Sequence, residues 1–243
     1  MQYGHTCSMV IIIGIHEKDL AVMSATELLS SRLFIGLETS EIEELILKSK
    51  PRTHLFIRDN ILWHEDDIVN GIGLLKSGTL LSQRLHSDGR VQLVRLYRPN
   101  DIINAETAMS HKQTSPLRVL AASSGSYLWF QLGNLFENPL LDPKIVKQIQ
   151  SNLLVYLADD AINYIKKADI LSHRTIRERL LMYLEVLSET NRGVIDIGMT
   201  QMELAQFLNV DRSTLSEELN KMRREGLLDY KKRVFRIKYL DEN

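Results

Sequence analysis

The sequence predicts an α+β fold in three successive parts: a strand-rich part, a long helix, and a helical part that ends in a strand hairpin. Two changes of pattern carry this prediction. Between residues 51 and 130, short apolar runs stand close together, which is typical of many short strands. From Pro143 onward, apolar residues recur every three to four positions, which is typical of helices. The 243 residues allow more than one domain, and 44% hydrophobic with 25% charged residues is ordinary for a globular protein.

Residues 1–26 are expected to be an N-terminal extension of uncertain role, either a short strand or a segment outside the fold. The apolar stretch from Met9 to Ile15 is far shorter than the roughly 20 residues that span a membrane. It also lacks the positively charged start and the cleavage site of a secretory signal. Met23 directly precedes the first helical pattern, so an alternative translation start at this residue remains open.

Residues 27–138 are predicted to form one strand-rich domain. It begins with two helical patterns, one that includes Leu28 and one from Glu41 to Leu47 with Thr39 or Ser40 as its cap. The strand-like runs that follow are His54–Ile57, Ile61–Trp63, Ile72–Leu75, Thr79–Leu81, Val91–Leu96, Arg118–Ala121 and Tyr127–Phe130. Turn signals ending in Gly78 and Gly89 separate some of these runs. This many short strands predicts a β-sandwich or jelly roll.

Residues 139–171 are predicted to contain one long helix. Its apolar positions include Ile145, Ile149, Leu153, Tyr156, Ala161 and Ile165. The run from Leu153 to Ala158 is apolar nearly all round, so the helix has more apolar surface than one small roll can cover. One side is expected to pack on the roll and the other on a second copy of the chain, as a two-stranded coiled-coil homodimer. A helix that is simply buried within one domain remains the alternative.

Residues 172–243 are predicted to form a helix–turn–helix domain. Ser172 is the expected cap of a helix that runs to Leu187, and a short strand from Val194 to Ile197 follows. Thr200 and Glu203 then have the spacing of a capping box at the start of the next helix. Asn209 is one of the few residues other than glycine that tolerates the left-handed conformation of a sharp turn.

The second helix of this pair is expected to start at Asp211 as its cap and to bury Leu215, Leu219 and Met222 along one stripe. It ends at Gly226. Two strand-like runs follow, and the basic turn Lys231-Lys232-Arg233 joins them. A helix–turn–helix followed by a basic two-stranded hairpin is a winged helix, and this combination predicts binding to double-stranded DNA. The candidate DNA-binding residues are Thr200, Gln201, Arg212, Ser213, Ser216, Glu217, Asn220, Lys232 and Arg233.

Charge and cysteine content exclude several classes of protein. The formal net charge is −1, so the chain is not a basic nucleic-acid coat, and its basic residues are concentrated between Lys221 and Lys238. Cys7 is the only cysteine. It excludes an internal disulfide and a cluster held by four cysteines of one chain, and it favours a cytoplasmic protein. No membrane association and no bound cofactor are expected.

The order of these elements resembles the Crp/Fnr superfamily, the bacterial transcription regulators related to the cyclic-AMP receptor protein. The resemblance is carried by ELLSSRLFIGL, by GLLKSGTLLSQRLHSDGRVQLVRLYRPNDII in the roll, by TIRERLLMYL after the long helix, and by the helix–turn–helix. It implies a cyclic-nucleotide-binding-like jelly roll, a homodimer on palindromic operators, contact with RNA polymerase, and no enzymatic activity. It also implies that a small-molecule effector modulates DNA binding.

The roll departs from the cyclic-AMP-binding members of this superfamily. Those members have Gly-Glu and later Arg-Ser in the phosphate cassette, and arginine suits phosphate because it offers a bidentate fork. Here the matching stretches are Asp101–Glu106 and Ser115-Pro116. Cyclic AMP is therefore not expected, and the effector stays unidentified. The expected effector-pocket residues are Asn104, Glu106, Ser115 and Arg118.

The second helix also departs from the family, and two other classes of function stay open. Glu217 stands where family members commonly have arginine; a glutamate accepts from cytosine and repels phosphate, so the family's operator does not carry over. The adjacent acids Glu217 and Glu218 keep open a ligand sensor that uses its winged helix to dock a protein. The run His64-Glu65-Asp66-Asp67 keeps open a cupin-like metalloenzyme, although a solvated turn is the expected structure there.

Overall fold

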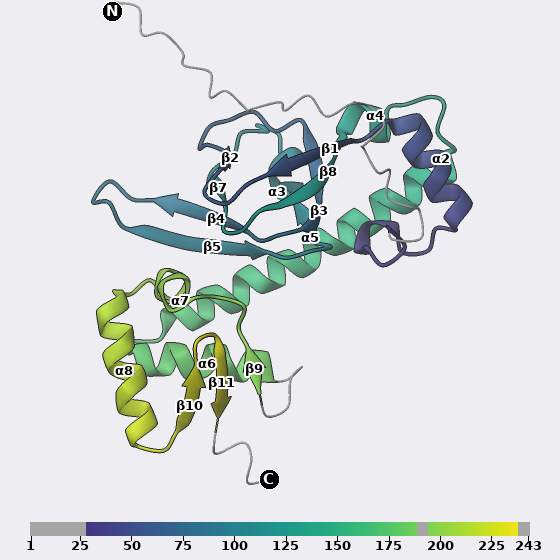
Figure 1. Ribbon diagram of the computed structural model, residues 1–243. Coiled ribbons are helices and arrows are strands. Elements are labelled where there is room, and N and C mark those ends of the chain that lie inside the picture. The colour runs from purple at the N-terminus through teal and green to yellow at the C-terminus, as the bar shows by residue number, and fades with distance from the viewer. Residues whose placement is uncertain (1–27, 189–193, 238–243) are drawn as a thin grey trace, which may run out of the picture.

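The structure is a computed structural model, and it describes residues 28–188 and 194–237. The expected extension of residues 1–26, with Met9–Ile15 and Cys7, lies outside the described residues. Figure 1 shows the described chain as an upper strand-rich part, a long helix that runs beneath it, and a lower part that contains the C-terminal helices and hairpin. Among the described helices, none has the length and apolar character needed to cross a membrane.

Two antiparallel four-stranded sheets form the upper part. The first has the order β1 (Arg52–Phe56), β8 (Gly125–Gln131), β3 (Gly71–Ser77) and β6 (Ile102–Ile103). The second has the order β2 (Ile61–Trp63), β7 (Arg118–Ala121), β4 (Leu80–Leu85) and β5 (Val91–Tyr97). The predicted jelly roll is therefore confirmed, and each strand predicted from the sequence is present. The two-residue strand β6 was not predicted, because it is too short to show an alternating pattern.

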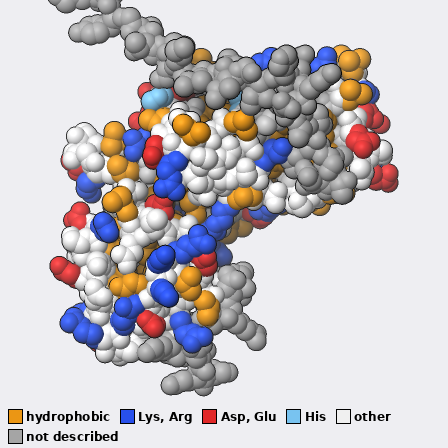
Figure 2. All heavy atoms as spheres, viewed as in Figure 1, with side chains coloured by type: hydrophobic (Ala, Val, Ile, Leu, Met, Phe, Trp, Pro, Cys, Tyr) orange, Lys and Arg blue, Asp and Glu red, His pale blue; other side chains and the backbone are white. Residues whose placement is uncertain are grey.

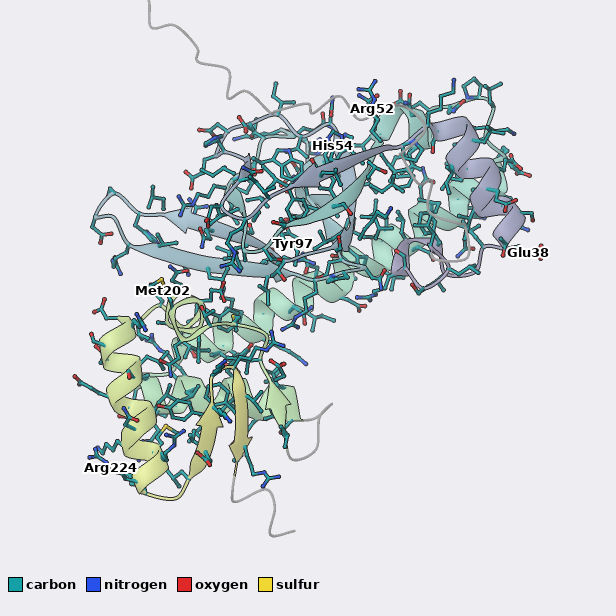
Figure 3. The ribbon with its side chains drawn as sticks, viewed as in Figure 1. Glu38, Arg52, His54, Tyr97, Met202 and Arg224 are labelled. Carbon is teal, nitrogen blue, oxygen red and sulfur yellow. The ribbon has the colours of Figure 1, made fainter. Side chains whose placement is uncertain are left out.

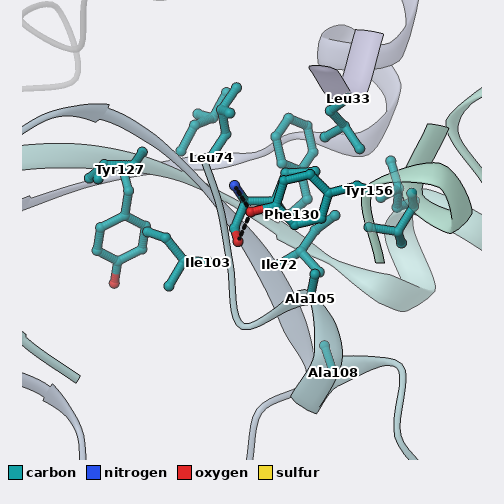
Figure 4. Close-up of a cluster of buried hydrophobic side chains, with 14 of the residues drawn as sticks. Leu33, Ile72, Leu74, Ile103, Ala105, Ala108, Tyr127, Phe130 and Tyr156 are labelled. Atoms are coloured by element: carbon teal, nitrogen blue, oxygen red, sulfur yellow. Dashed lines mark hydrogen bonds between the residues drawn. The ribbon is translucent and has the colours of Figure 1, made fainter. Parts of the chain in front are cut away.

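The core of the roll lies between the two sheets and extends to the long helix. Ile72, Leu74 and Phe130 are buried in it together with Leu33 and Tyr156, which come from outside the sheets (Figure 4). Tyr127 lies beside Trp63, with ring centroids 5.6 Å apart. On β7, buried positions alternate with half-buried ones because successive side chains of a strand point to opposite faces, whereas β3 and β4 each begin with a run of buried residues. One continuous apolar core thus fixes the sheets relative to the helix.

Gly125, at the start of β8, allows β8 and β3 to approach closely. A Cβ at this position would collide with the carbonyl oxygen of Ser77. We therefore expect Gly125→Ala to lower the free energy of unfolding by about 1–3 kcal/mol, because two backbones must separate to admit the methyl group. Chemical denaturation measures this change. Gly133→Ala is the matched control, since the nearest atom to its Cβ is Glu137 Oε2 at 3.9 Å; a loss as large as that of Gly125→Ala would contradict the argument.

The segment before the roll differs from its prediction. Leu28 is helical, a turn follows it, and the 3₁₀ turn η1 (Arg32–Phe34), which Ser31 caps, comes next, so Leu33 and Phe34 do not continue the helix of Leu28. The helix α2 (Thr39–Ser49) begins after Glu38, and the amide N–H of Glu38 donates to Glu41 Oε2 at 2.9 Å. The expectation that Thr39 or Ser40 caps this helix is therefore wrong, because both residues lie inside it. Two short helices, α3 (Ala105–Ala108) and α4 (Leu132–Phe136), complete the roll.

The long helix α5 (Pro143–Ser172) confirms the predicted helical pattern. Asp142 caps it, and its carboxylate accepts from the N–H of Lys144 at 2.8 Å. Its inward residues Ile145, Ile149, Leu153 and Tyr156 are buried against the roll. Ala161 and Ile165, which the sequence pattern placed on the same stripe, are instead exposed, because the 3.6-residue repeat turns them away from the roll.

The C-terminal part contains α6 (Ile176–Ser188), β9 (Ile195–Asp196), α7 (Gln201–Leu208), α8 (Arg212–Arg224), β10 (Leu228–Lys231) and β11 (Val234–Ile237). The three strands form a small antiparallel sheet in the order β10-β11-β9. Ser172 does not cap α6 as expected, since it is the last residue of α5. Thr175 takes that place: its Oγ1 accepts from the N–H of Glu178 at 3.2 Å. The predicted winged helix is confirmed.

The winged helix packs directly on the outer face of β4 and β5. Leu81 and Leu93 of these strands are buried in the same apolar cluster as the helices α6, α7 and α8. Lys167 of α5 donates to the carbonyl oxygens of Leu93 and Val94, and its Nζ lies 4.0 Å from the ring centroid of Phe207 in α7. Burial lowers the pKa of Lys167 to about 7. The roll, the long helix and the winged helix therefore meet at one shared junction.

Candidate nucleic-acid interface

The start of α7 is held by the predicted capping box. Thr200 Oγ1 accepts from the N–H of Glu203 at 3.2 Å, and the carboxylate of Glu203 accepts from the N–H of Thr200 at 2.7 Å. Leu204, Ala205 and Leu208 are buried behind this start. Asn209 ends the helix in the left-handed conformation with φ of 54°. These local features fix the turn between α7 and α8 as the sequence predicts.

The helix α8 buries one stripe and presents the opposite side to solvent. Leu215, Leu219 and Met222 are fully buried in the core of the winged helix. The candidate residues Arg212, Ser213, Glu217 and Asn220 are exposed on this helix, and Ser216 is half-buried. Asp211 occupies the predicted cap position, but its side chain makes no capping hydrogen bond. The N–H groups of the first turn are thus not satisfied by this side chain, and such a helix start favours anions.

The hairpin of β10 and β11 is tied to the end of α8. Arg223 forms an ion pair with Asp229 at 2.9 Å and lies over the ring of Tyr230, 4.0 Å from its centroid. The hydroxyl of Tyr230 donates to Asn220 Oδ1 at 3.2 Å. The hydrogen bond to Asn220 therefore orients one candidate DNA-binding side chain through the wing, a link that sequence spacing did not reveal.

A groove of about 950 Å³ separates the start of α7 from the hairpin tip. Its lining includes four candidate residues: Thr200 and Gln201 on one side, Lys232 and Arg233 on the other. Lys232 has a φ of 56° at the tip, and Arg233 forms an exposed ion pair with Asp196 at 3.0 Å. Lys and Arg side chains lie on the visible face of this C-terminal part in Figure 2. The groove thus carries basic groups on the wall formed by the hairpin tip.

The helices α7 and α8 also differ in how they relate to the roll. Figure 3 places Met202 of α7 close to the roll and Arg224 at the end of α8 that is farthest from it. Gln206 of α7 makes a weak hydrogen bond with Gln83 of β4 at 3.4 Å. The roll therefore contacts α7, while the exposed side of α8 and the wing are left open to a large partner.

Glu218 does not share the exposed face of Glu217. Its carboxylate pairs with Arg177 of α6 at 2.6 Å, and its side chain is largely shielded. The expectation of two adjacent acids on one solvent-facing surface is therefore wrong. Residues one position apart on a helix point in directions about 100° apart, so a single carboxylate remains on the outer side.

The four expected effector-pocket residues do not all lie together. Glu106 and Ser115 line one hollow of about 410 Å³ beside α3. Asn104 is buried at the start of α3 with a φ of 60°, and its Nδ2 has no partner among the described residues. Arg118 instead donates to Gln83 Oε1 at 2.9 Å. It lies on the outer face of β7, because its neighbour Val119 points into the core.

A buried polar network between β5 and α5 was missed from the sequence. Arg95 forms an ion pair with Asp160 and donates to the hydroxyl of Tyr156 at 2.5 Å. The Tyr156 hydroxyl in turn donates to the carbonyl oxygen of Ile102 at 3.0 Å. Burial raises the pKa of Asp160, and the charge of Arg95 opposes that shift. The sequence signal for this network was the spacing of Arg95 and Tyr97. They are two residues apart on one strand, so their side chains point to the same face, and Tyr97 is buried.

The acidic run His64 to Asp67 forms a turn after β2. The N–H of His64 donates to Asp67 Oδ2 at 2.7 Å, which closes the turn. The predicted solvated turn is confirmed. Within residues 28–188 and 194–237, no three His, Cys, Asp or Glu residues are placed to hold a metal ion together.

Comparison with known proteins identifies the C-terminal part. Residues 178–242 match the family model described as the Crp-like helix-turn-helix domain. The chain is Crp/Fnr-like. It is 20% identical to the regulatory protein HlyX of Actinobacillus pleuropneumoniae over 211 residues. The matched region covers 84% of this chain and 84% of HlyX.

Solved structures extend the Crp/Fnr likeness to the roll and the long helix. FixK2 from Bradyrhizobium japonicum matches with a TM-score of 0.63 and 18% identity, over 79% of this chain and 96% of that one. The c-di-GMP responsive global regulator CLP of Xanthomonas campestris matches with a TM-score of 0.67 and 15% identity, over 82% and 99%. The predicted Crp/Fnr resemblance and fold class are thus confirmed. HlyX is described as a regulatory protein and CLP as a global regulator linked to gene expression, which are regulatory rather than enzymatic roles.

Proposed function

We propose that this Crp/Fnr-like protein is a sequence-specific transcription regulator that binds palindromic operators as a homodimer. The carrying observation is the open surface formed by the solvent-facing side of α8, the start of α7 and the wing. In this proposal residues 27–138 are the effector-sensing roll, residues 139–171 the dimerisation helix and residues 172–243 the DNA-binding domain. Residues 1–26 remain an extension whose role is not assigned.

The helix α8 is proposed to enter the major groove, with Arg212, Ser213, Ser216 and Glu217 directed at base edges. Asn220 sits at the wing end of the same face, oriented by Tyr230. Thr200 and Gln201 with Lys232 and Arg233 line the groove at the edge of this surface, where one phosphate backbone would run. Phosphate contacts of this kind set the register of the protein on the duplex, whereas the base contacts of α8 select the sequence.

The dimer is supported by an unpartnered apolar stripe along α5. Val155, Ile162 and Ile165 are 55%, 52% and 68% exposed in the single chain. With the exposed Ala158 between them, they follow the alternating spacing of three and four residues that forms a coiled-coil seam. Leu154, beside this seam, is exposed as well. A second copy related by two-fold symmetry would cover the stripe and place two α8 helices about 34 Å apart on the DNA.

A small effector and RNA polymerase are the further proposed partners. For the effector, the supporting feature is the hollow beside α3, which is lined by acidic, basic and hydroxyl side chains, including Glu106, Lys112 and Ser115. The helix α3 also contacts α5, so a ligand there would reach the dimer helix through one element. Cyclic AMP is not proposed, since the arginine that would hold its phosphate is absent from this hollow. Contact with RNA polymerase rests on the family likeness alone.

Selection of bound sequences from a random duplex pool tests the proposal. The dimer is expected to enrich a palindrome, and its affinity is expected to fall steeply with salt because phosphate contacts release counterions. Glu217→Arg is expected to change the selected half-site at one base pair, from a preference for cytosine contact to one for guanine.

Lys147→Arg, on α5 away from the wing, is the control and should leave the selected sequence unchanged. The selection is repeated with a cell metabolite extract, so that a required effector is supplied. A flat salt dependence with no enriched sequence under both conditions would contradict DNA binding and would favour a protein-docking role for the winged helix.

A further inference from the structure

Arg177, at the start of α6, bridges two carboxylates of α8. Its Nε donates to Glu218 Oε1 at 2.6 Å, and its Nη1 pairs with Glu225 Oε2 at 2.7 Å. Its Nη2 is buried and has no partner within the described part of the chain. The guanidinium thus lies between α6 and the side of α8 that faces it, with 30% of the Arg177 side chain exposed.

The two carboxylates are placed so that one cation controls both the rotation and the axial position of α8. Glu218 and Glu225 are seven residues apart, which is about 10 Å along a helix and within about 20° around its axis. One of them lies in the middle of α8 and the other at its C-terminal cap. A single planar group bound to both therefore resists turning of the helix and sliding along it.

The apolar stripe alone would hold α8 less strictly. Leu215, Leu219 and Met222 bury the helix, but hydrophobic contact is not directional and tolerates small rotations. The fork of an arginine has a fixed planar geometry, which a lysine ammonium lacks. Because Arg212, Ser213 and Glu217 project from the same helix, a rotation of α8 would move all three relative to a bound base pair.

We propose that Arg177 is a positioning residue for sequence readout: by clamping Glu218 and Glu225, it sets the rotation at which α8 meets the DNA. This inference rests on the proposed DNA-binding function and adds to it a residue that lies outside the DNA-facing surface. Ion pairs between neighbouring elements are used elsewhere in proteins to fix register, which is the role assigned here.

Charge neutralisation is a second effect of the same contact, and it needs to be separated from positioning. The hydrogen bond from Arg177 lowers the pKa of Glu225, so the carboxylate is held in its charged form. Removing the arginine would leave two uncompensated acids near a polyanion and weaken binding to any DNA sequence. Arg177→Lys keeps the positive charge and loses the fork, so it separates the two effects.

The experiment measures affinities of the full-length protein for its selected palindrome and for a scrambled duplex of equal length, over a range of salt. For Arg177→Lys we expect the ratio of the two affinities to fall by about 10-fold, the size of one good base contact. The affinity for the scrambled duplex and its salt slope should stay as in the wild type. For Arg177→Gln we expect the same loss of ratio and, in addition, weaker binding to both duplexes.

Arg174→Gln is the matched control, because Arg174 is exposed and its side chain has no partner among the described residues. It removes the same charge three residues away and should leave the ratio unchanged. Glu225→Gln, at the exposed end of α8, breaks one arm of the clamp and covers the case in which an Arg177 variant does not fold; we expect a smaller fall in the ratio. An unchanged ratio in Arg177→Lys and Glu225→Gln would overturn the positioning role. A wild type that binds both duplexes equally would instead overturn the proposed function.

Discussion

Replacing Arg95 with methionine is expected to lower the free energy of unfolding by about 3–5 kcal/mol, because it leaves the Asp160 carboxylate buried without its counter-charge. The side chains of Arg95 and Asp160 are only 13% and 9% exposed. The guanidinium also holds the hydroxyl of Tyr156 and lies over the ring of Tyr97, 4.6 Å from its centroid. Methionine keeps most of the volume, so the loss reports the charge and the hydrogen bonds. Urea denaturation followed by circular dichroism measures it.

Arg90→Met is the matched control for this prediction. Arg90 precedes the same strand and pairs with Asp88, but their side chains are 62% and 52% exposed. An exposed ion pair contributes about 0–1 kcal/mol, so this variant should be nearly as stable as the wild type. Combining Arg95→Met with Asp160→Leu should recover much of the lost stability, because no unpaired charge then remains. Equal losses in the two arginine variants, or no recovery in the double variant, would show that burial does not set the cost.

Replacing Ile165 with glutamate is expected to convert the proposed dimer into a monomer and to lower affinity for a palindromic site by at least about 100-fold, since two linked half-site contacts become separate ones. Ile165 lies in the exposed stripe of α5, where a charge would be buried between two copies. Sedimentation equilibrium gives the mass of the complex, and a fluorescence titration with labelled duplex gives the affinity.

Leu47→Glu is the control for the dimer prediction, because Leu47 is a large apolar residue that is 74% exposed and belongs to α2 rather than to the exposed stripe of α5. It should leave the mass and the affinity unchanged. If Ile165→Glu is also still dimeric, the stripe is not the dimer contact. If it is monomeric with unchanged affinity, the two half-sites are not read together.

Local signals predicted the elements that local forces determine. The alternation from Val91 to Leu96 gave a strand because each side chain of a strand meets one face. The spacing of Leu215, Leu219 and Met222 gave a helix with a buried stripe. The turn at Asn209 followed from the conformations open to one residue. In each case the sequence window contains all the partners that decide the structure.

Features that depend on distant partners could not be predicted in this way. Nothing near Arg177 in the sequence points to Glu218 and Glu225, and nothing near Arg95 points to Asp160 on another element. The cap of α6 was assigned to Ser172 rather than Thr175 because both residues suit a cap, and only the preceding helix decides how far it runs. The missed contacts are therefore the polar ones that link separate elements.

The junction where Leu81 and Leu93 of the roll enter the apolar cluster of the winged helix has a consequence for modular exchange. A winged helix that is cut out at residue 172 leaves behind the leucines that cover part of its own interior. Grafted onto another sensor, it would present that surface to water unless the new host supplied side chains of matching shape. Its ability to be recombined with other sensors thus depends on two strands that lie more than seventy residues before the cut.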